Sequence, residues 1–365
     1  MRPRHAVLWA VLVLSLPLVG IDDPAAQAKE ALRKGAYAKA EKAFEALIAK
    51  DGEDPDALTG LAEVHLVTGK YSSAERSARK SIECDPAFSP AYGVLAEALY
   101  TVGKYGEADK VATQGIEKND LDVRSRFYRA MSRYDTGQYD VLDASQELDW
   151  FVSDFEARGE KWSERDWLYG GQGIWLYGRY AGEGGIARSL VENLVASEPI
   201  KTSADLIAML GWFHVEWYDY PGAKSDFKAA LDKNAQHPWA MLGAELVGGD
   251  EQQNPYEQKA VRAPQVLKVN PNLVEAHCQH AGKLIGGDKH DEAIEAADKA
   301  LAVNPSHVAA LAYKATALFL SGKHDAVEAL AKKALDINPK GGEFYWVLGE
   351  SVGNKRMTMT SYEYL

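Results

Sequence analysis

Two histidines and a cysteine near residue 280 have the side-chain types and the spacing that could bind a metal ion. His277 and His280 are three residues apart and would share one face of a helix, and Cys278 and His290 lie close by in sequence. Imidazole and thiolate groups are zinc ligands. The alternative is that these side chains fill packing positions, because other segments carry leucine or tyrosine at the corresponding places. We favour packing, and we expect no metal and no cofactor.

Four glycine clusters, at residues 170–173, 182–185, 248–249 and 286–287, raise the question of a phosphate-binding loop. Such a loop needs a preceding buried strand and a Gly-Lys-Ser or Gly-Lys-Thr string, and the sequence predicts no such strand and contains neither string. We therefore interpret the clusters as helix–helix turns and sites of close packing. A His-Glu-x-x-His zinc-peptidase motif is also absent from the sequence. We predict no catalytic residues and no enzyme activity in this segment.

Tryptophans crowd the middle of the chain. They are either large side chains that fill the core of irregular segments or the anchors of a ligand groove, since aromatic residues often dominate interfaces. The residues concerned are Trp150, Trp162, Trp167, Trp175, Trp212, Trp217 and Trp239.

The elements that position these residues recur every 34 residues. Glycine stands at residues 35, 69, 103 and 137, and tyrosine follows two residues after each of these glycines. Near the other end, prolines at residues 271, 305 and 339 have the same spacing. Within a unit, apolar positions such as Tyr92, Leu95 and Leu99 recur with helical periodicity. Because glycine adopts the left-handed conformation at a helix end, Gly103 is predicted to separate two helices.

This pattern resembles the tetratricopeptide repeat, a pair of helices of 34 residues. The matching strings are Leu58-x-x-Leu61-Ala62, Tyr92-x-x-Leu95-Ala96, Tyr345-x-x-Leu348-Gly349 and Ala40-x-x-x-Phe44, with Pro86, Pro305 and Pro339 as closing prolines. The resemblance implies an all-α fold, a right-handed α-solenoid of antiparallel helix pairs. We expect about nine to ten units, some of them degenerate.

The register of the units divides the chain. Residues 1–20 are a predicted signal peptide, residues 21–156 form an N-terminal block of repeats, residues 157–273 an irregular tryptophan-rich middle, and residues 274–365 a C-terminal block whose last unit is incomplete. Units are expected to begin near Ile21, Pro55, Ser89, Val123, Gly170, Ala204, Val274, Val308 and Gly342. The step to Gly170 contains about thirteen extra residues, 157–169, which we expect to lengthen two helices. Pro264 is expected to kink or shorten a second helix.

In this family the first helix of each unit lines the concave wall, and that wall binds other proteins or peptides. The resemblance therefore implies a protein-interaction scaffold. The predicted groove residues are Glu63, Glu97, Tyr100, Phe127, Met131, Tyr134, Trp212, Phe319, Trp346 and Glu350. Their acidic and aromatic mix suits an extended or helical peptide with basic and apolar side chains. Four nearby arginines, at positions 124, 126, 129 and 133, either pair with these acids or hold a carboxylate.

The N-terminus has the order of a secretory signal. Arg2 and Arg4 precede the uncharged, mostly apolar run of residues 6–19, which is too short to span a membrane comfortably. We predict export to the periplasm, the cell envelope or the medium, with an uncleaved anchor as the alternative. After removal of the signal we expect no membrane span. The net charge of −12 argues against nucleic-acid binding.

Two further features leave alternatives open. Cys84 and Cys278 could form a disulfide in an exported protein, but distant repeats do not meet in an extended array, so we favour two buried small side chains. The apolar end of the chain, after Lys355, is a poor cap for a solenoid. Either these residues fold back over the last helix, or the natural chain continues. In the latter case the segment could be the recognition arm of a larger envelope enzyme, such as a peptidase-like hydrolase, with its catalytic domain beyond Leu365.

Overall fold

The computed structural model describes residues 23–138, 148–153, 155, 162–180, 202–248 and 264–340, and within these ranges the chain is helical and contains no strand. The first helices of the repeats are α1 (Pro24–Arg33), α3 (Pro55–Val67), α5 (Ser89–Thr101), α7 (Val123–Asp135), α10 (Glu164–Tyr180), α13 (Ala204–Glu216), α15 (Pro238–Val247), α16 (Val274–Gly286) and α18 (Val308–Leu320). The second helices are α2 (Tyr37–Lys50), α4 (Tyr71–Cys84), α6 (Tyr105–Lys118), α14 (Tyr220–Lys233), α17 (His290–Val303) and α19 (His324–Ile337). The all-α prediction is confirmed.

Local sequence explains where these helices begin and end. At the start of α3, Pro55 occupies the first helical turn, and the Asp54 carboxylate accepts hydrogen bonds from the amides of Asp56 and Ala57 at 3.0 and 3.1 Å. The helix stops before Gly69, whose φ of +74° turns the chain so that α4 begins at Tyr71. The glycines at residues 35, 103 and 137 also have a positive φ, between 63° and 79°. The predicted left-handed turns are therefore present.

Small residues let the paired helices approach closely. Ala40, Ala74 and Ala108, at equivalent positions of α2, α4 and α6, are fully buried. The ring of Phe44 on α2 lies against Gly60 on α3, where an added Cβ would come within 2.3 Å of the ring. The core of the solenoid therefore depends on alanine and glycine beside large rings.

The inserted residues lengthen α10. This helix has 17 residues, whereas α7 and α13 each have 13, and it begins at Glu164 rather than near Gly170. Gly170 and Gly173 lie inside α10, where the rings of Phe155 and Phe151 fill the space that a Cβ would occupy. For these two glycines close packing was the right interpretation and a turn was wrong. The other helix that the insertion was expected to lengthen lies partly outside the described residues.

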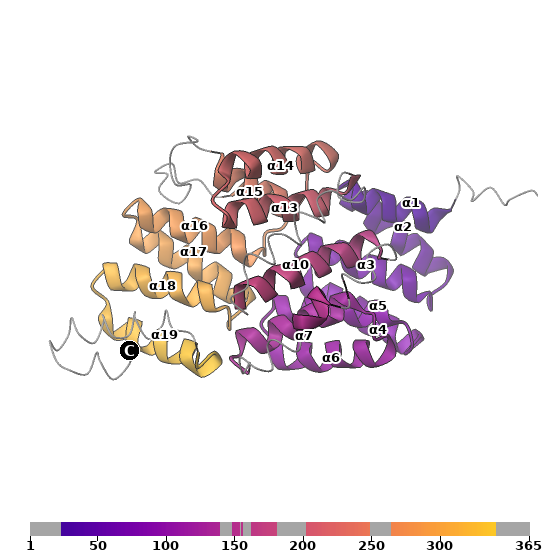
Figure 1. Ribbon diagram of the computed structural model, residues 1–365, viewed down its shortest axis with the longest axis horizontal. Coiled ribbons are helices and arrows are strands. Elements are labelled where there is room, and N and C mark those ends of the chain that lie inside the picture. The colour runs from indigo at the N-terminus through magenta and orange to yellow at the C-terminus, as the bar shows by residue number, and fades with distance from the viewer. Residues whose placement is uncertain are drawn as a thin grey trace, which may run out of the picture.

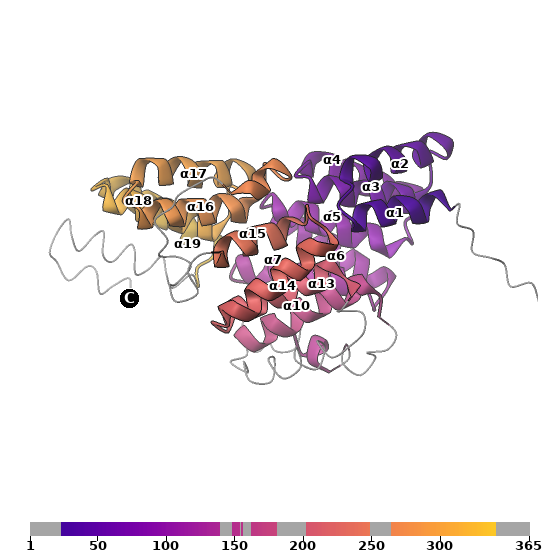
Figure 2. The same cartoon turned by 90° about the horizontal axis from the view of Figure 1, so that it is seen from above.

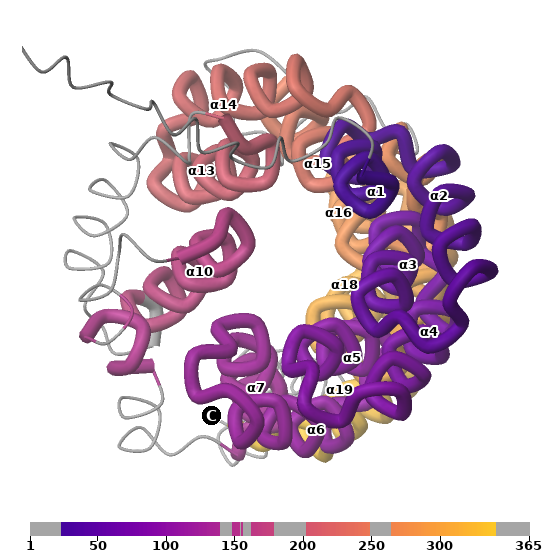
Figure 3. The backbone as a smooth tube through the Cα atoms, turned by 90° about the vertical axis from the view of Figure 1, so that its right-hand side faces the viewer, coloured from indigo at the N-terminus to yellow at the C-terminus, as the bar shows by residue number. Residues whose placement is uncertain are grey.

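The helix pairs form a right-handed array that curves into a ring with first helices on its inner side and second helices outside, as the view along the ring shows (Figure 3). The ring is longer than one turn, so α15 to α19 lie beside α1 to α6 (Figures 1 and 2). Contacts join the two turns: an added Cβ at Gly35 would lie 2.0 Å from Asn234 Oδ1, and one at Gly103 would lie 2.2 Å from Asn304 Oδ1. The second turn of the superhelix therefore packs against the first.

Several other predictions can be compared with the structure. Pro264 precedes a 3-10 helix, η3 (Gln265–Lys268), of only four residues, as expected of a shortened element. Both cysteines are free; Cys278 is buried and Cys84 is half-buried. None of the described helices is long and apolar enough to cross a membrane. The signal peptide predicted for residues 1–20 lies outside the described residues, and it and the domain boundaries at residues 156 and 273 remain predictions.

Candidate functional site

The acidic residues predicted to line the groove meet an arginine from a neighbouring first helix. Glu63 on α3 and Glu97 on α5 occupy equivalent positions in consecutive units. Arg124 on α7 donates from Nε to Glu97 at 2.8 Å and from Nη1 to Glu63 at 3.2 Å. Burial alone would lower the pKa of Arg124, but the charge and hydrogen bond of Glu97, together with the nearby Tyr169 and Tyr128, outweigh that effect and raise it. Of the two roles considered for this arginine, pairing with the acids is the one observed.

Helix α10 covers this ionic cluster from the inside of the ring. Arg165, in its first turn, forms a second ion pair with Glu63, and the Tyr169 hydroxyl donates to Glu97 at 2.7 Å. The ring of Tyr169 lies 5.7 Å from that of Phe127, and the Arg124 guanidinium sits over the same ring at 5.2 Å. Glu63, Glu97 and Phe127 are therefore brought together as predicted, but their side chains already contact residues of this chain.

Arg165 and Tyr169 were not recognised from the sequence as groove residues. Both belong to the inserted segment, which breaks the 34-residue register and so has no equivalent position in other units. Their spacing of four residues was the available signal, because it places a basic and an aromatic side chain on one face of a helix.

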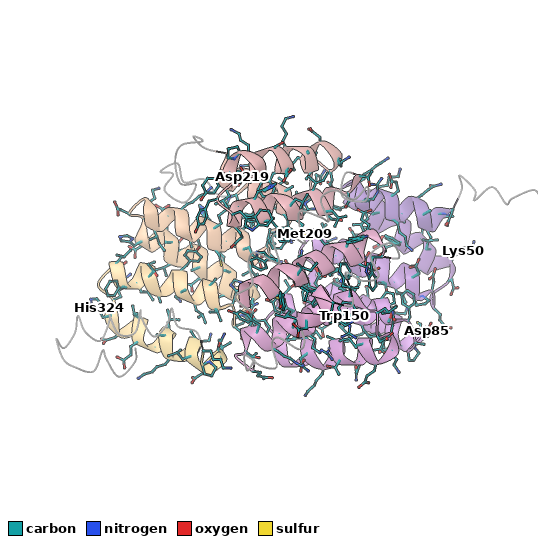
Figure 4. All side chains as sticks on the ribbon, in the orientation of Figure 1. Lys50, Asp85, Trp150, Met209, Asp219 and His324 are labelled. Carbon is teal, nitrogen blue, oxygen red and sulfur yellow. The ribbon has the colours of Figure 1, made fainter. Side chains whose placement is uncertain are left out.

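The other arginines of the fourth unit are also engaged. Arg133 donates from Nε to the Asp109 carboxylate at 2.7 Å. Arg126 donates to the carbonyl of Asp120 and lies 4.4 Å from the centre of the Trp150 ring. Met209 belongs to the large aromatic cluster between α7, α10 and α13, and Trp150 packs against this cluster; both residues are labelled in Figure 4. Packing is thus the observed role for the tryptophans at residues 150, 162, 167, 175 and 217.

Three predicted groove residues lie on α5 and α7. The Tyr100 hydroxyl donates to Asp135 at 2.5 Å, and burial raises the pKa of this carboxyl to about 6. Met131 packs half-buried against the aromatic cluster. The carbonyl of Tyr134 accepts from Asn338 at 3.3 Å, a contact between the two turns of the ring.

A tryptophan pair on α13 and α15 remains accessible. The Trp212 indole donates from Nε1 to the carbonyl of Trp239 at 3.2 Å, and the two rings lie 6.4 Å apart, edge to face. The ring of Phe227 supports Trp212 from the other side at 5.5 Å. Trp239 is 43% exposed, although large apolar side chains are usually covered. Trp239 was not among the predicted groove residues, because its unit lies in the irregular stretch where the register was lost.

The remaining predicted groove residues lie towards the C-terminus. Phe319 on α18 is half-buried, with its ring 5.3 Å from that of His324, and the adjacent Leu320 is 49% exposed. Trp346 and Glu350 lie outside the described residues.

The histidines near residue 280 occupy packing positions. His277 is buried and its Nε2 lies 2.9 Å from the carbonyl of Pro271, and the Cys278 sulfur lies 3.8 Å from His307 Nδ1. His290 begins α17 in the position where Tyr71 begins α4. In the described part of the chain, no three histidine, cysteine or acidic side chains are arranged to hold a metal ion.

The sequence contains one Gly-x-Ser-x-Gly string, at residues 349–353. These residues lie outside those the structure describes. A nucleophile elbow requires a strand before the serine and a helix after it. The repeat register instead predicts a first helix from about Gly342, so the sequence predicts no strand before this serine.

Comparison with known proteins identifies the repeats. The family model described as tetratricopeptide repeat matches residues 25–87 and 284–342. These two segments, about a third of the chain, match the tetratricopeptide repeat, and the helices described in them have the paired arrangement of that repeat. The tetratricopeptide-repeat fold indicates a role in protein–protein interaction. A search of the curated proteins found no relative that matches the chain.

Among solved structures, similar chains include yeast Tom70, with 12% identity over 93% of this chain and 90% of that chain and a TM-score of 0.43. The Cut9–Hcn1 hetero-tetramer of the APC/C is 12% identical, with 90% and 55% covered and a TM-score of 0.45. An O-GlcNAc transferase mutant from Thermobaculum terrenum is 21% identical, with 35% and 25% covered and a TM-score of 0.34. The chain thus spans a quarter of the transferase and about half of the Cut9–Hcn1 chain.

Proposed function

We propose that this protein is a scaffold that binds a protein or peptide partner on the concave side of its ring, at the surface around Trp212 and Trp239. The exposed indole of Trp239 is the observation that carries this proposal. Aromatic side chains anchor many interfaces because they bury a large area and lose little conformational entropy. Trp239 is also held in place through its backbone by Trp212, which limits the entropy lost on binding.

The charges around this surface suggest what the partner presents. Asp205, which lies at the start of α13, is half exposed and holds His237 through a contact of 2.7 Å. Trp239 follows two residues after His237. A partner with an apolar side chain for the tryptophan pair and a basic group for Asp205 would satisfy both. This matches the basic and apolar peptide expected from the sequence, but moves its site away from Glu63 and Glu97.

The location of this activity is part of the proposal. The basic start and the apolar run of residues 6–19 favour export. The mass of the protein purified from the envelope and from the medium of its native host tests this. Cleavage near Gly20 supports a periplasmic or secreted scaffold, an intact chain in the envelope supports the uncleaved anchor, and an intact chain found only inside the cell contradicts export.

The binding test compares two exposed aromatic residues. Trp239→Ala removes the proposed anchor, and Tyr218→Ala removes a side chain that is 80% exposed on the turn before α14. With an affinity-captured partner, we expect Trp239→Ala to weaken binding about thirtyfold, the size of an anchor residue's effect, and Tyr218→Ala to change it little. Equal affinities of the wild type and Trp239→Ala, with an unchanged circular dichroism spectrum, would refute the site.

A further inference from the structure

A repeated contact joins the two turns of the ring at four places. Each rung consists of a left-handed glycine in the first turn and a buried asparagine in the second turn. The pairs are Gly35 with Asn234, Gly69 with Asn270, Gly103 with Asn304, and Gly137 with Asn338. The four asparagines are at most 8% exposed. We call this set of rungs the inter-turn clasp.

The same hydrogen bonds recur in three rungs. In the second rung, the Asn270 amide donates from Nδ2 to the Tyr71 hydroxyl at 3.1 Å, and that hydroxyl donates to the carbonyl of Asn272 at 3.2 Å. The rungs of Tyr37 and Tyr105 repeat both bonds, with donor–acceptor distances between 3.1 and 3.4 Å. In the fourth rung, Asn338 donates to the carbonyl of Tyr134 instead. The tyrosine and asparagine of a rung are 197 or 199 residues apart in sequence.

The glycines make room for these contacts. An added Cβ at Gly69 would lie 2.2 Å from Asn270 Oδ1, closer than any real Cβ contact, and the positive φ already excludes most other residues. A glycine at the end of a first helix would be expected from the helix cap alone. The missing side chain, however, is also what admits the asparagine from the other turn.

All four clasp positions carry asparagine, whereas the equivalent positions of the first turn carry Asp51, Asp85 and Asn119. Asp51 and Asp85 end second helices of the first turn, at the edge of the ring away from the clasp, and each caps its own turn through Oδ1. Asn270 and Asn304 cap their own turns in the same way, through Oδ1, at 3.0 Å. Either residue can therefore form the turn, but only asparagine has the Nδ2 donor that the tyrosine hydroxyl of the other turn accepts.

The tyrosines of the clasp stand at the first residue of their helices. Tyr37, Tyr71 and Tyr105 begin second helices whose starts face the other turn. The equivalent first residues of the second-turn helices α14, α17 and α19 are Tyr220, His290 and His324. A tyrosine at this position is therefore not confined to the clasp, and the hydrogen bonds to the other turn are what distinguish the three clasp tyrosines.

We propose that the inter-turn clasp holds the superhelix in a closed, two-turn form and couples the N-terminal repeats to the C-terminal repeats, so that the two open and unfold together. In an ordinary solenoid each repeat contacts only its neighbours, and stability is a sum along the chain. Here the rungs add contacts between repeats about 200 residues apart. The clasp also fixes the curvature of the ring, and with it the width of the concave side.

The test removes hydroxyl groups without removing rings. The triple variant Tyr37→Phe, Tyr71→Phe, Tyr105→Phe loses the hydrogen bonds of three rungs. The control is Tyr92→Phe, because the buried Tyr92 hydroxyl also donates to a backbone carbonyl, that of Pro86 at 2.9 Å, but within one unit. We expect the closed-to-open ratio of the full chain to fall roughly fivefold for each hydroxyl lost in the clasp. Small-angle scattering should show a larger radius of gyration for the triple variant and not for Tyr92→Phe.

Coupling is measured with a distant reporter. Leu311→Ala creates a cavity in α18, where Leu311 is fully buried. In an otherwise wild-type chain, this change should accelerate amide hydrogen exchange in α3 to α6 as well as in α18. With the triple variant as background, the acceleration should be confined to the C-terminal repeats. If the triple variant itself loses helicity, Tyr105→Phe alone replaces it in both measurements.

Two results would overturn the proposal. One is a scattering profile of the folded clasp variant that matches those of the wild type and of Tyr92→Phe. The other concerns hydrogen exchange. The proposal fails if Leu311→Ala does not accelerate exchange in α3 to α6 of the otherwise wild-type chain, or if it accelerates exchange there equally with and without the clasp hydroxyls. None of these measurements requires a binding partner, so they test the clasp independently of the proposed scaffold function.

Discussion

Replacing Arg124 tests the ionic cluster beneath α10. The Arg124 side chain is 10% exposed, and it is paired with the Glu63 and Glu97 side chains, which are 13% and 21% exposed. Arg124→Ala leaves two largely buried carboxylates without this partner, and breaking a buried ion pair in this way costs about 3–5 kcal/mol. Arg165→Ala removes a side chain that is 46% exposed, so its loss should cost about 1 kcal/mol or less. The assay is equilibrium unfolding by urea, followed by circular dichroism.

A compensated variant separates charge from packing. Arg124→Met combined with Glu63→Leu, Glu97→Leu and Tyr169→Phe replaces the buried part of the network with apolar groups and leaves only the half-exposed Arg165. This variant should recover most of the stability that Arg124→Ala loses. The reasoning is refuted if Arg124→Ala costs no more than Arg165→Ala. It is equally refuted if the compensated variant is less stable than Arg124→Ala, because the loss would then come from packing rather than from unpaired charge.

Two further predictions concern packing and pH. Gly60→Ala should destabilise the fold by about 1–3 kcal/mol, because the new Cβ would meet the Phe44 ring at 2.3 Å. The control is Gly106→Ala on α6, where no atom lies within 4 Å of the added Cβ. In the same unfolding assay, this control should leave the stability unchanged or raise it by up to about 1 kcal/mol. The pKa of Asp135 is raised from 3.8 to about 6, so its neutral form is favoured in the folded state, and the unfolding free energy should fall by about 3 kcal/mol as the pH rises from about 4 to about 6. Asp135→Asn, which keeps an acceptor for Tyr100, should remove this part of the pH dependence, and an unchanged difference between the two proteins from pH 4 to 8 would contradict the assignment.

The helical architecture was largely predictable because short sequence signals that recur in each repeat determine where the helices begin and end. Pro55, Ser89, Val123, Ala204, Val274 and Val308 each begin a first helix where the register placed it. The reason is physical: a proline or a capping side chain opens most of these helices, although α16 has neither. A left-handed residue follows each helix, usually a glycine but Tyr218 after α13 and Asp288 after α16, and these signals act within a few residues. Where the register failed, at Gly170 and after Gly248, the local signals were absent or had another purpose.

The content of the groove was less predictable because it depends on contacts between distant residues. The family pattern placed Glu63 and Glu97 on the concave wall, but nothing periodic indicated that Arg165 and Tyr169 would reach them. The clasp shows the same limit. Asn270 and Gly69 each have a sufficient local explanation in a turn, so their contact across 201 residues could not be read from either segment alone.

Site-specific photo-crosslinking tests the proposed scaffold function most directly. A photoreactive amino acid would be placed at position 239 and, in the control protein, at position 218, and each full-length chain would be irradiated in its native host. The account predicts a discrete adduct with one partner protein from position 239 and none with that partner from position 218. The absence of an adduct at position 239, or the same adducts from both positions, would contradict it.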